Sequence, residues 1–355
     1  MSAATLAALA GQYRVRPGRQ DSIAGGRPPL AAALLRGQAA ATAASRLAAL
    51  FALCGLAHRL CAELAVGAAG ASGEHEREDT ANAAHAMLLT RETLAVHLRC
   101  IWTDWPARLA AAAPHRLPDV EAAGAPGWVE RHVLGMPARA WLAHWADDPR
   151  GCLSAWSARA ATFPARLLAD CRAYADTMRA TPRPLVIDEA RLSELAGAIA
   201  GSAAFAHAPL QHGLPAESGV WTRSDDPRAL DYDTPWLRLG ARVADVARLA
   251  AGDGSAGALR FGARTCAPGE ALGWCEMARG VLVHWVRLAP DDAARIEDYR
   301  VVAPTEWNFH RQGTLAQALS RLDRTPDDRA LAARTGVWMG AFDPCIAYAV
   351  DTGSA

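Results

Sequence analysis

Residues 258–289 read ALRFGARTCAPGEALGWCEMARGVLVHWVRLA, and this stretch decides the fold class. Apolar and polar side chains alternate along it between turn residues, and the alternation continues in 296–304, IEDYRVVAP. Such alternation is typical of strands that bury one face of a sheet. The sequence therefore predicts a small antiparallel β layer within residues of about 258–310.

The rest of the chain carries a helical period. Apolar side chains recur at helical spacing in Ala- and Leu-rich stretches, which are 31–66, 80–102, 141–176, 192–206 and 237–251. Such spacing predicts packed helices, and 31–66 reads as one long helical stretch. We expect a mainly α protein with a small antiparallel β layer, an α+β fold whose helical body spans about 30–250. No internal repeat and no long low-complexity linker divides the sequence, so a single domain over 1–355 is expected.

The charges of the chain cancel. Lys and Arg number 37, Asp and Glu number 37, and 51% of the residues are hydrophobic. Without excess positive charge, no field attracts nucleic acid or an anionic membrane surface, so neither is an expected partner. No apolar run reaches membrane-spanning length, and the first 16 residues lack the basic start of a secretory signal. We predict a cytoplasmic location, where the eight cysteines are thiols or metal ligands.

Cysteine and histidine side chains recur near the end of the first helical stretch. Cys54, His58 and Cys61 are four and seven residues apart, which places them on one face of a helix. A zinc site needs further ligands, and structural zinc motifs usually contain paired cysteines. For His58 and Cys61 we therefore favour a buried apolar face over a metal site.

Three further segments contain polar side chains of types that are catalytic or binding residues in some proteins and structural residues in most. They are Glu217-Ser218-Gly219 with Arg223; the run 276–285 with Arg279 and His284, followed by Ala303-Pro304-Thr305-Glu306-Trp307-Asn308-Phe309-His310; and the terminal Asp343-Pro344-Cys345. Taken one by one, they read as a turn or cap, a charge at a strand end, a packed histidine and turn prolines.

Taken together and in this order, the four segments resemble the large subunit of nickel-iron hydrogenases. That family carries a Cys-Gly-x-Cys-x-x-x-His motif, an Arg-Gly-x-Leu-x-His strand, a Pro-Thr-x-Trp-Asn segment and a terminal Asp-Pro-Cys-x-x-Cys-x-x-His. The resemblance covers nearly the whole chain and is weakest between about residues 110 and 200. It implies the large-subunit fold.

The departures from the family pattern bear on function. In the family the second cysteine of each pair bridges nickel to iron, and here Ala57 and Tyr348 stand at those two positions. Cys54 and Cys345 match the first cysteine of each pair, and Asp351 replaces the terminal histidine. Alanine has no donor atom, and a phenolate is a harder ligand than a thiolate. No nickel is therefore expected.

The wording of three segments is similar to that of the HupK/HoxV-type hydrogenase maturation proteins. These segments are APTEWNFH at 303–310, ESG at 217–219 and TDWP at 103–106. The resemblance implies a non-enzymatic scaffold on which an Fe(CN)2CO group is built or held, with Cys54 and Cys345 as the iron ligands. The implied partners are the nickel-iron hydrogenase large-subunit precursor and the maturation proteins that build the iron-cyanide group. An apolar partner surface including Trp102 and Trp105 is a further expectation, although tryptophan is usually buried.

The same resemblance implies roles around the iron. Arg279 would donate to one cyanide nitrogen and Thr305 to the other, Pro304 would shape the wall around carbon monoxide, and His58 and Glu217 would support the site. Two other functions stay open. One is a hydrogenase-like redox or sensing subunit with substituted ligands, and the other is a metal-free maturation chaperone. Cys266 and Cys275 flank a predicted hairpin and are expected as reduced thiols.

Overall fold

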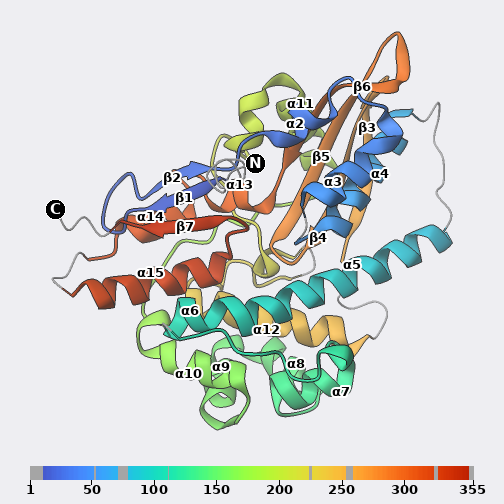
Figure 1. The fold of residues 1–355 in the computed structure, drawn as a ribbon. Coiled ribbons are helices and arrows are strands. Elements are labelled where there is room, and N and C mark those ends of the chain that lie inside the picture. Colours follow the sequence, from blue (N-terminus) through green and yellow to red (C-terminus); the bar gives the residue numbers. More distant parts are fainter. Residues whose placement is uncertain are drawn as a thin grey trace.

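The computed structural model describes residues 11–51, 53–70, 79–110, 112–223, 226–252, 259–323 and 327–351. The first ten residues, which bear on the predicted absence of a secretory signal, lie outside these ranges. None of the helices in these ranges is long and apolar enough to cross a membrane. A helical layer lies below a four-stranded sheet, and a smaller sheet joins the two ends of the chain (Figure 1).

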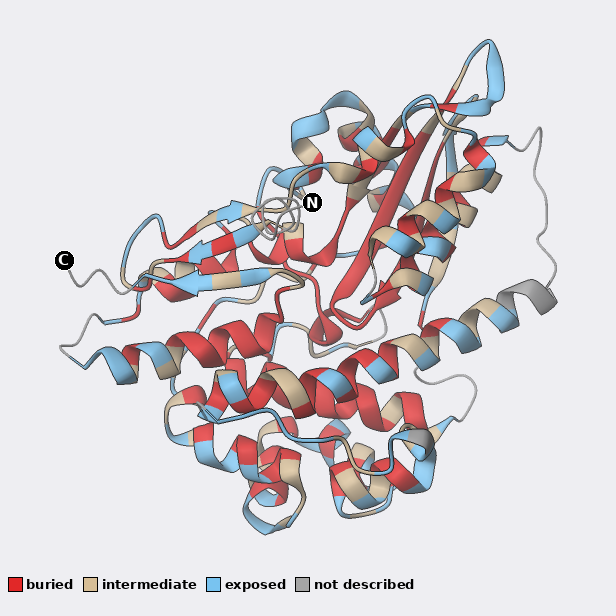
Figure 2. Cartoon of the chain, viewed as in Figure 1, coloured by how far each residue is buried: buried red, intermediate tan, exposed pale blue. Residues whose placement is uncertain are grey.

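The predicted β layer is confirmed as an antiparallel meander. Its strands are β3 (Phe261–Ala267), β4 (Glu270–Met277), β5 (Gly280–Ala289) and β6 (Asp292–Val302), in that spatial order. Strand β5 is buried along most of its length (Figure 2). Alternate residues of β5 enter two cores, with Val283 and Trp285 on one face and Val286 and Leu288 on the other.

The predicted helical character is also confirmed, and the helices of the structure follow in chain order. They are α2 (Leu30–Leu35), α3 (Ala43–Leu50), α4 (Gly55–Gly70), α5 (Asp79–Arg99), α6 (Trp105–Ala110), α7 (Pro126–Val129), α8 (Ala138–Asp147), α9 (Pro149–Arg159), α10 (Phe163–Ala175), α11 (Glu189–Gly201), α12 (Pro235–Ala251), α13 (Pro304–Asn308), α14 (Thr314–Ser320) and α15 (Asp328–Phe342). Helix α12 is buried on almost every side, including the polar residues Arg238, Arg242 and Asp245 (Figure 2). Charged groups buried at this depth need partners, and they have them near the candidate site.

The prediction of one long helical stretch at 31–66 is wrong in its continuity. The chain breaks after Leu35, where Gly37 adopts φ +74°, and again between Leu50 and Gly55. Phe51 ends α3 with non-helical dihedral angles. Cys54 lies in the second break, directly before α4, so it is not part of a continuous helical face with His58 and Cys61.

A second sheet, not expected from the sequence, joins the two ends of the chain. Its order is β2 (Ile23–Gly26), β1 (Gln12–Val15) and β7 (Ala347–Val350), and β1 pairs antiparallel with β2 and parallel with β7. Each strand has four residues, too few to give a clear period. The pairing of β1 with β7 places the segment around Cys345 beside the N-terminal strands.

Candidate metal centre

Cys54 directly precedes the first residue of helix α4. Its backbone N–H donates to the carbonyl of Phe51 at 3.0 Å, and its own carbonyl accepts from His58 N–H at 3.1 Å, which closes the first turn of α4. The next N–H groups of the helix, those of Leu56 and Ala57, donate to the Glu92 carboxylate at 2.7 and 2.9 Å. Glu92 of α5 therefore caps α4 and fixes the turn that presents the Cys54 thiol.

Cys345 follows a sharp turn at the end of α15. Asp343 is the C-cap residue of α15 and adopts a left-handed conformation, with φ +46° and ψ +75°. A non-glycine residue in this region is strained and needs support from its surroundings. The turn directs Pro344 and Cys345 away from the helix axis, and Cys345 is half-buried between α15 and β7.

Three guanidinium groups hold Asp343 in place. Its buried carboxylate lies 2.9 Å from Arg108 Nη1, 3.3 Å from Arg242 Nη1 and 3.2 Å from Arg279 Nε. These charges outweigh the effect of burial and hold the pKa of Asp343 below its usual range. Arg242 extends the network to His97 at 3.0 Å. The surplus of positive charge beside the two cysteines favours an anionic occupant.

The two predicted iron ligands come together in one electrostatic environment. Burial raises the pKa of the Cys54 thiol to about 12, and nearby Cys345 contributes to the rise, while Arg279 and Arg27 oppose it. Arg279 in turn interacts with Asp343, Cys345 and Cys54. The thiols from opposite ends of the sequence thus face the same two guanidinium groups.

Arg279 and Thr305 are also brought to the cysteines. Arg279 is buried in the turn between β4 and β5, and its Nη1 has no hydrogen-bond acceptor among the described residues. The Thr305 hydroxyl lies 3.3 Å from the Sγ of Cys345. Thr305 sits in the first turn of α13, and Pro304, at the first helical position, is buried beside it.

His58 points away from the thiols. Its Nδ1 lies 2.9 Å from the Nε2 of His284, and the Nδ1 of His284 lies 2.8 Å from the hydroxyl of Tyr299. Burial lowers the pKa of both histidines, to about 3 for His284, so both rings are neutral. His58 also stacks on Phe51 with ring centroids 3.8 Å apart. It supports the wall of the site through this ring.

Glu217 is likewise a supporting residue rather than a contact of the cysteines. Its buried carboxylate lies 2.8 Å from Arg238 Nη1. The next residue, Ser218, exchanges two hydrogen bonds with the side chain of Asn308 and accepts from the N–H of Val281 at 2.7 Å. The 217–219 segment therefore connects α13 to the start of β5, next to Arg279.

Ala57 and Tyr348, which stand where the family has its bridging cysteines, have other surroundings in the structure. Ala57 is buried in the first turn of α4. Tyr348 lies in β7 opposite Tyr13 of β1. Burial raises the pKa of the Tyr348 phenol, and its charged neighbours are Arg108 and Asp104 rather than the thiols. Neither position supplies a sulfur to the site.

A second group of potential ligands lies on the far side of Asp343. Ligand atoms of Cys100, Asp104 and Asp343 lie within 4.8 Å of one another. Arg108 already lies within 3.8 Å of Asp104 and 2.9 Å of Asp343, and Arg242 faces Asp343 as well. A metal cation there would meet the positive charges of Arg108, Arg242 and Arg279, so this group is part of the buried ion network.

The structure corrects one minor expectation and agrees with another. Trp102 and Trp105 are buried, with 3% and 0% of their surface exposed, so they form no partner surface. Cys275 contacts Cys61, with their sulfur atoms 3.4 Å apart, whereas Cys266 is exposed near the end of β3. All three thiols are free.

Sequence reasoning missed Arg27, Glu92 and Asp343 as site residues. Arg27 lies in Gly25-Gly26-Arg27-Pro28-Pro29, where a single charge sits within a turn sequence, and this pattern was the available signal. Asp343 was quoted only as part of the Asp-Pro-Cys motif. Glu92 is one of many charges on a helix, and nothing in its local sequence marks it as a cap for another helix.

Comparisons with known proteins identify the family of the chain. The profile of a family described as nickel-dependent hydrogenase matches residues 251–351. The hydrogenase expression/formation protein HoxV of Cupriavidus necator is 40% identical to this chain over an alignment of 374 positions. The alignment covers 97% of this chain and 96% of HoxV. The hydrogenase expression/formation protein HupK of Rhizobium leguminosarum bv. viciae is 29% identical, with 93% of this chain and 89% of HupK covered.

Solved structures share the fold. The Ni-Fe-Se hydrogenase from D. vulgaris Hildenborough matches with a TM-score of 0.59 at 15% identity, over 91% of this chain and 92% of the matched chain. The reduced Ni-Fe-Se hydrogenase from Desulfomicrobium baculatum gives 0.57 at 14% identity, over 91% and 93%. The mainly helical fold with small sheets is thus that of the hydrogenase large subunit, and the chain belongs to the family of hydrogenase expression/formation proteins that includes HoxV and HupK.

Proposed function

We propose that this protein is a non-enzymatic scaffold that holds an Fe(CN)2CO group during nickel-iron hydrogenase maturation, with the iron bound by Cys54 and Cys345. The observation that carries the proposal is that both thiols interact electrostatically with Arg279, while Ala57 and Tyr348 stand where two further cysteines would be needed. The relatives named for hydrogenase expression and formation support the same assignment.

The side chains at the site fit this group chemically. A cyanide nitrogen accepts hydrogen bonds, and Arg279 offers a buried Nη1 without an acceptor among the described residues. Thr305 offers its hydroxyl beside Cys345. Carbon monoxide accepts poorly and is suited to an apolar wall, to which the buried Pro304 contributes.

The number of sulfur ligands suits delivery. Two thiolates hold an iron that brings its own diatomic ligands, and two bonds are broken more easily than four when the group moves on. A nickel-iron pair needs bridging sulfurs, which Ala57 and Tyr348 do not supply, so no nickel is expected. This count separates a scaffold from a working hydrogenase subunit.

Loading the site requires the thiols to lose their protons. Burial raises the pKa of Cys54 to about 12, so this thiol is protonated at neutral pH before iron binds. Iron binding then releases the proton, because the thiolate is the ligand. Arg27 and Arg279 stabilise the resulting negative charge, as neighbouring guanidinium groups do.

The proposed iron group implies two protein partners. A donor that builds the iron-cyanide group and the large-subunit precursor that receives it would both have to reach the site, and both act in the cytoplasm on this proposal. The names of HoxV and HupK place those relatives in hydrogenase formation, which supports such partners for this chain.

Infrared spectroscopy on anaerobically purified protein tests the function. Wild-type protein produced alongside a complete maturation system should show CO and CN stretching bands with stoichiometric iron. The Cys54→Ala and Cys345→Ala variants should lose them, whereas Cys171→Ala, also buried, and Cys152→Ala, also half-buried, should keep them. Absence of the bands from wild-type protein would contradict the proposal.

The same samples separate the two other functions. Stoichiometric nickel with hydrogen-dependent dye reduction would identify a redox or sensing subunit. Normal hydrogenase maturation with both Cys54→Ala and Cys345→Ala would identify a metal-free chaperone.

A further inference from the structure

The guanidinium of Arg27 touches the candidate site directly. Arg27 follows β2 and precedes Pro28, and its Nη2 donates to the Sγ of Cys345 at 2.6 Å and to the Oγ1 of Thr305 at 3.3 Å. Its guanidinium carbon lies 5.0 Å from the centroid of the Phe51 ring. Arg27 therefore connects the N-terminal sheet, the C-terminal cysteine and the start of α13.

The donors and acceptors in these hydrogen bonds follow from the groups involved. A guanidinium only donates, so the hydroxyl oxygen of Thr305 must accept from Arg27. A hydroxyl has a single hydrogen, which Thr305 can direct to the sulfur of Cys345, 3.3 Å away, to a ligand beside that sulfur, or to the phenol oxygen of Tyr13, which also hydrogen-bonds with Thr305. Arg27 thereby orients Thr305 as a donor toward the position next to Cys345.

Arg27 adds a positive charge beside the sulfur atoms that the iron would deprotonate. An iron(II) with two cyanides is neutral, and two thiolates add two negative charges. Arg27 and Arg279 supply two positive charges, and both act on Cys54. The Nε of Arg27 is buried without an acceptor among the described residues, so it too has a donor to spare.

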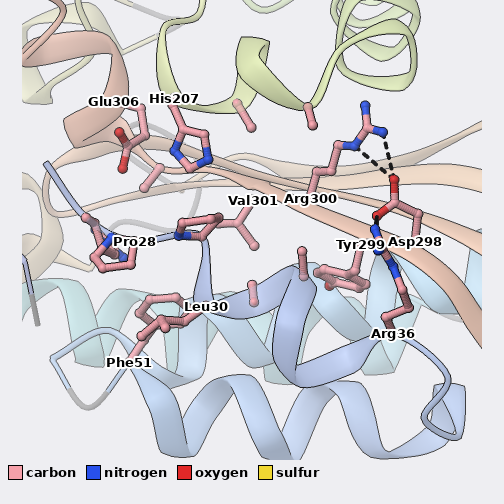
Figure 3. Close-up of a pocket in the computed structure, with 17 residues that line it drawn as sticks. Pro28, Leu30, Arg36, Phe51, His207, Asp298, Tyr299, Arg300, Val301 and Glu306 are labelled. Carbon is pink, nitrogen blue, oxygen red and sulfur yellow. Dashed lines mark hydrogen bonds and ion pairs between the residues drawn. The ribbon is translucent and has the colours of Figure 1, made fainter. Parts of the chain in front are cut away.

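Arg27 also lies between the site and an open groove. A groove of about 750 Å³ and a smaller pocket of about 130 Å³ share Arg27, Pro28, His207 and Glu306 in their walls. Figure 3 shows Glu306 and His207 at one end of the smaller pocket, while Arg36, Asp298 and Arg300 are joined by ion pairs at the other. Among the described residues, no hydrogen bond engages the Glu306 carboxylate. Burial raises the pKa of Glu306 to about 7, while nearby Arg27 opposes the rise, so this group is partly charged at neutral pH.

We propose that Arg27 is a positioning residue of the metal centre, which holds the sulfur of Cys345 and turns the hydroxyl of Thr305 toward the ligands of the iron. The inference rests on the proposed function for its cargo, but the contact between Arg27 and Cys345 exists in the protein without iron. Arg27 is thus a second guanidinium of the centre, besides Arg279.

The contact is tested first in iron-free protein. Alkylation of Cys345 by iodoacetate and by iodoacetamide, followed by mass spectrometry, compares an anionic and a neutral reagent at the same sulfur, so the ratio of rates reports the local charge. Arg27→Gln should lower the ratio roughly fivefold, the factor for unit charges about 4 Å apart in water. Arg27→Lys should retain most of it. Arg36→Gln, which removes an arginine from the other end of the pocket, should leave the ratio unchanged.

The positioning role is tested in the loaded protein. Arg27→Lys keeps the charge but loses the planar pair of donors, so the CN stretching bands should shift while iron content stays constant. An unchanged ratio and unshifted bands in the Arg27 variants would overturn the inference and leave the scaffold function standing. If wild-type protein shows no CN bands, the scaffold function fails, and the alkylation ratio alone decides whether Arg27 controls Cys345. The Arg27→Lys variant also serves where Arg27→Gln does not fold.

Discussion

The Nε of Arg279 donates to the backbone oxygen of Asp343 at 3.1 Å and lies 3.2 Å from the carboxylate of the same residue. A side chain at the start of β5 thereby holds the strained turn that precedes Cys345. The same contact leaves Nη1 of Arg279 without an acceptor among the described residues. One residue thus fixes the turn before Cys345 and, under the proposed function, retains a donor for the iron group.

Replacing Asp343 with Asn should destabilise the protein by about 3 kcal/mol, because it leaves two buried guanidinium groups, Arg242 and Arg279, and the partly buried Arg108 without their shared carboxylate. Urea unfolding measures the loss. The control is Asp292→Asn, which removes an exposed pair with Arg295 and should cost less than about 0.5 kcal/mol. A loss below about 1 kcal/mol for Asp343→Asn would show that the network does not hold the turn.

Replacing Glu92 with Ala should cost about 1–2 kcal/mol, because two N–H groups at the start of α4 lose their acceptor. Urea unfolding again gives the value. Glu63→Ala removes a carboxylate from an exposed pair with Arg59 and serves as the control, with little expected change. Equal effects of the two substitutions would contradict the capping role.

Lowering the pH should weaken the fold through His97. Burial and the neighbouring Arg242 hold its pKa at about 4, although its partner Asp245 opposes the shift. In the unfolded chain a histidine titrates near 6.5. Between these values the unfolded chain binds a proton that the folded chain does not, so stability falls as the pH drops from about 6.5 to about 4, by roughly 3 kcal/mol for this residue.

His97→Gln isolates that contribution. Glutamine keeps an acceptor for Arg242 and a donor for Asp245 but does not titrate. The dependence of unfolding free energy on pH should therefore become shallower by about one proton. The same slope in wild-type and variant protein would show that His97 is not buried in the neutral form.

The thiols should react with iodoacetamide in the order of their exposure. Cys266 is exposed and should be modified first, half-buried Cys152 and Cys345 should follow, and the buried cysteines should react only after unfolding. Mass spectrometry of the native protein identifies each site. Modification of Cys61 or Cys275 as fast as that of Cys266 would contradict the packing of α4 against β4.

The sequence predicts the β layer and the helical body because their side-chain periods are local. The second sheet escapes such reasoning, since β1 and β7 are short and their pairing partners lie at opposite ends of the chain. Cys54, Cys345, Arg279 and Thr305 are found through motifs. Arg27 and Glu92 are not, because their roles depend on partners far away in the sequence.

Support residues show a similar limit. His58 and Glu217 are predicted to support the site, and in the structure His58 contacts Phe51, while Glu217 precedes Ser218, which bonds to Asn308. A motif identifies which residues accompany a site, but the direction of each side chain depends on packing. For His58 the deciding partner is His284 on β5, and for Glu217 it is Arg238 on α12.

X-ray absorption at the iron edge of anaerobically loaded protein tests the central claim most directly, because it counts the sulfur atoms bound to iron. Two sulfur ligands are predicted for wild-type protein, and one for whatever iron Cys345→Ala or Cys54→Ala retains. Iron with no sulfur ligand, or a count of two that neither substitution lowers, would contradict a centre built from Cys54 and Cys345.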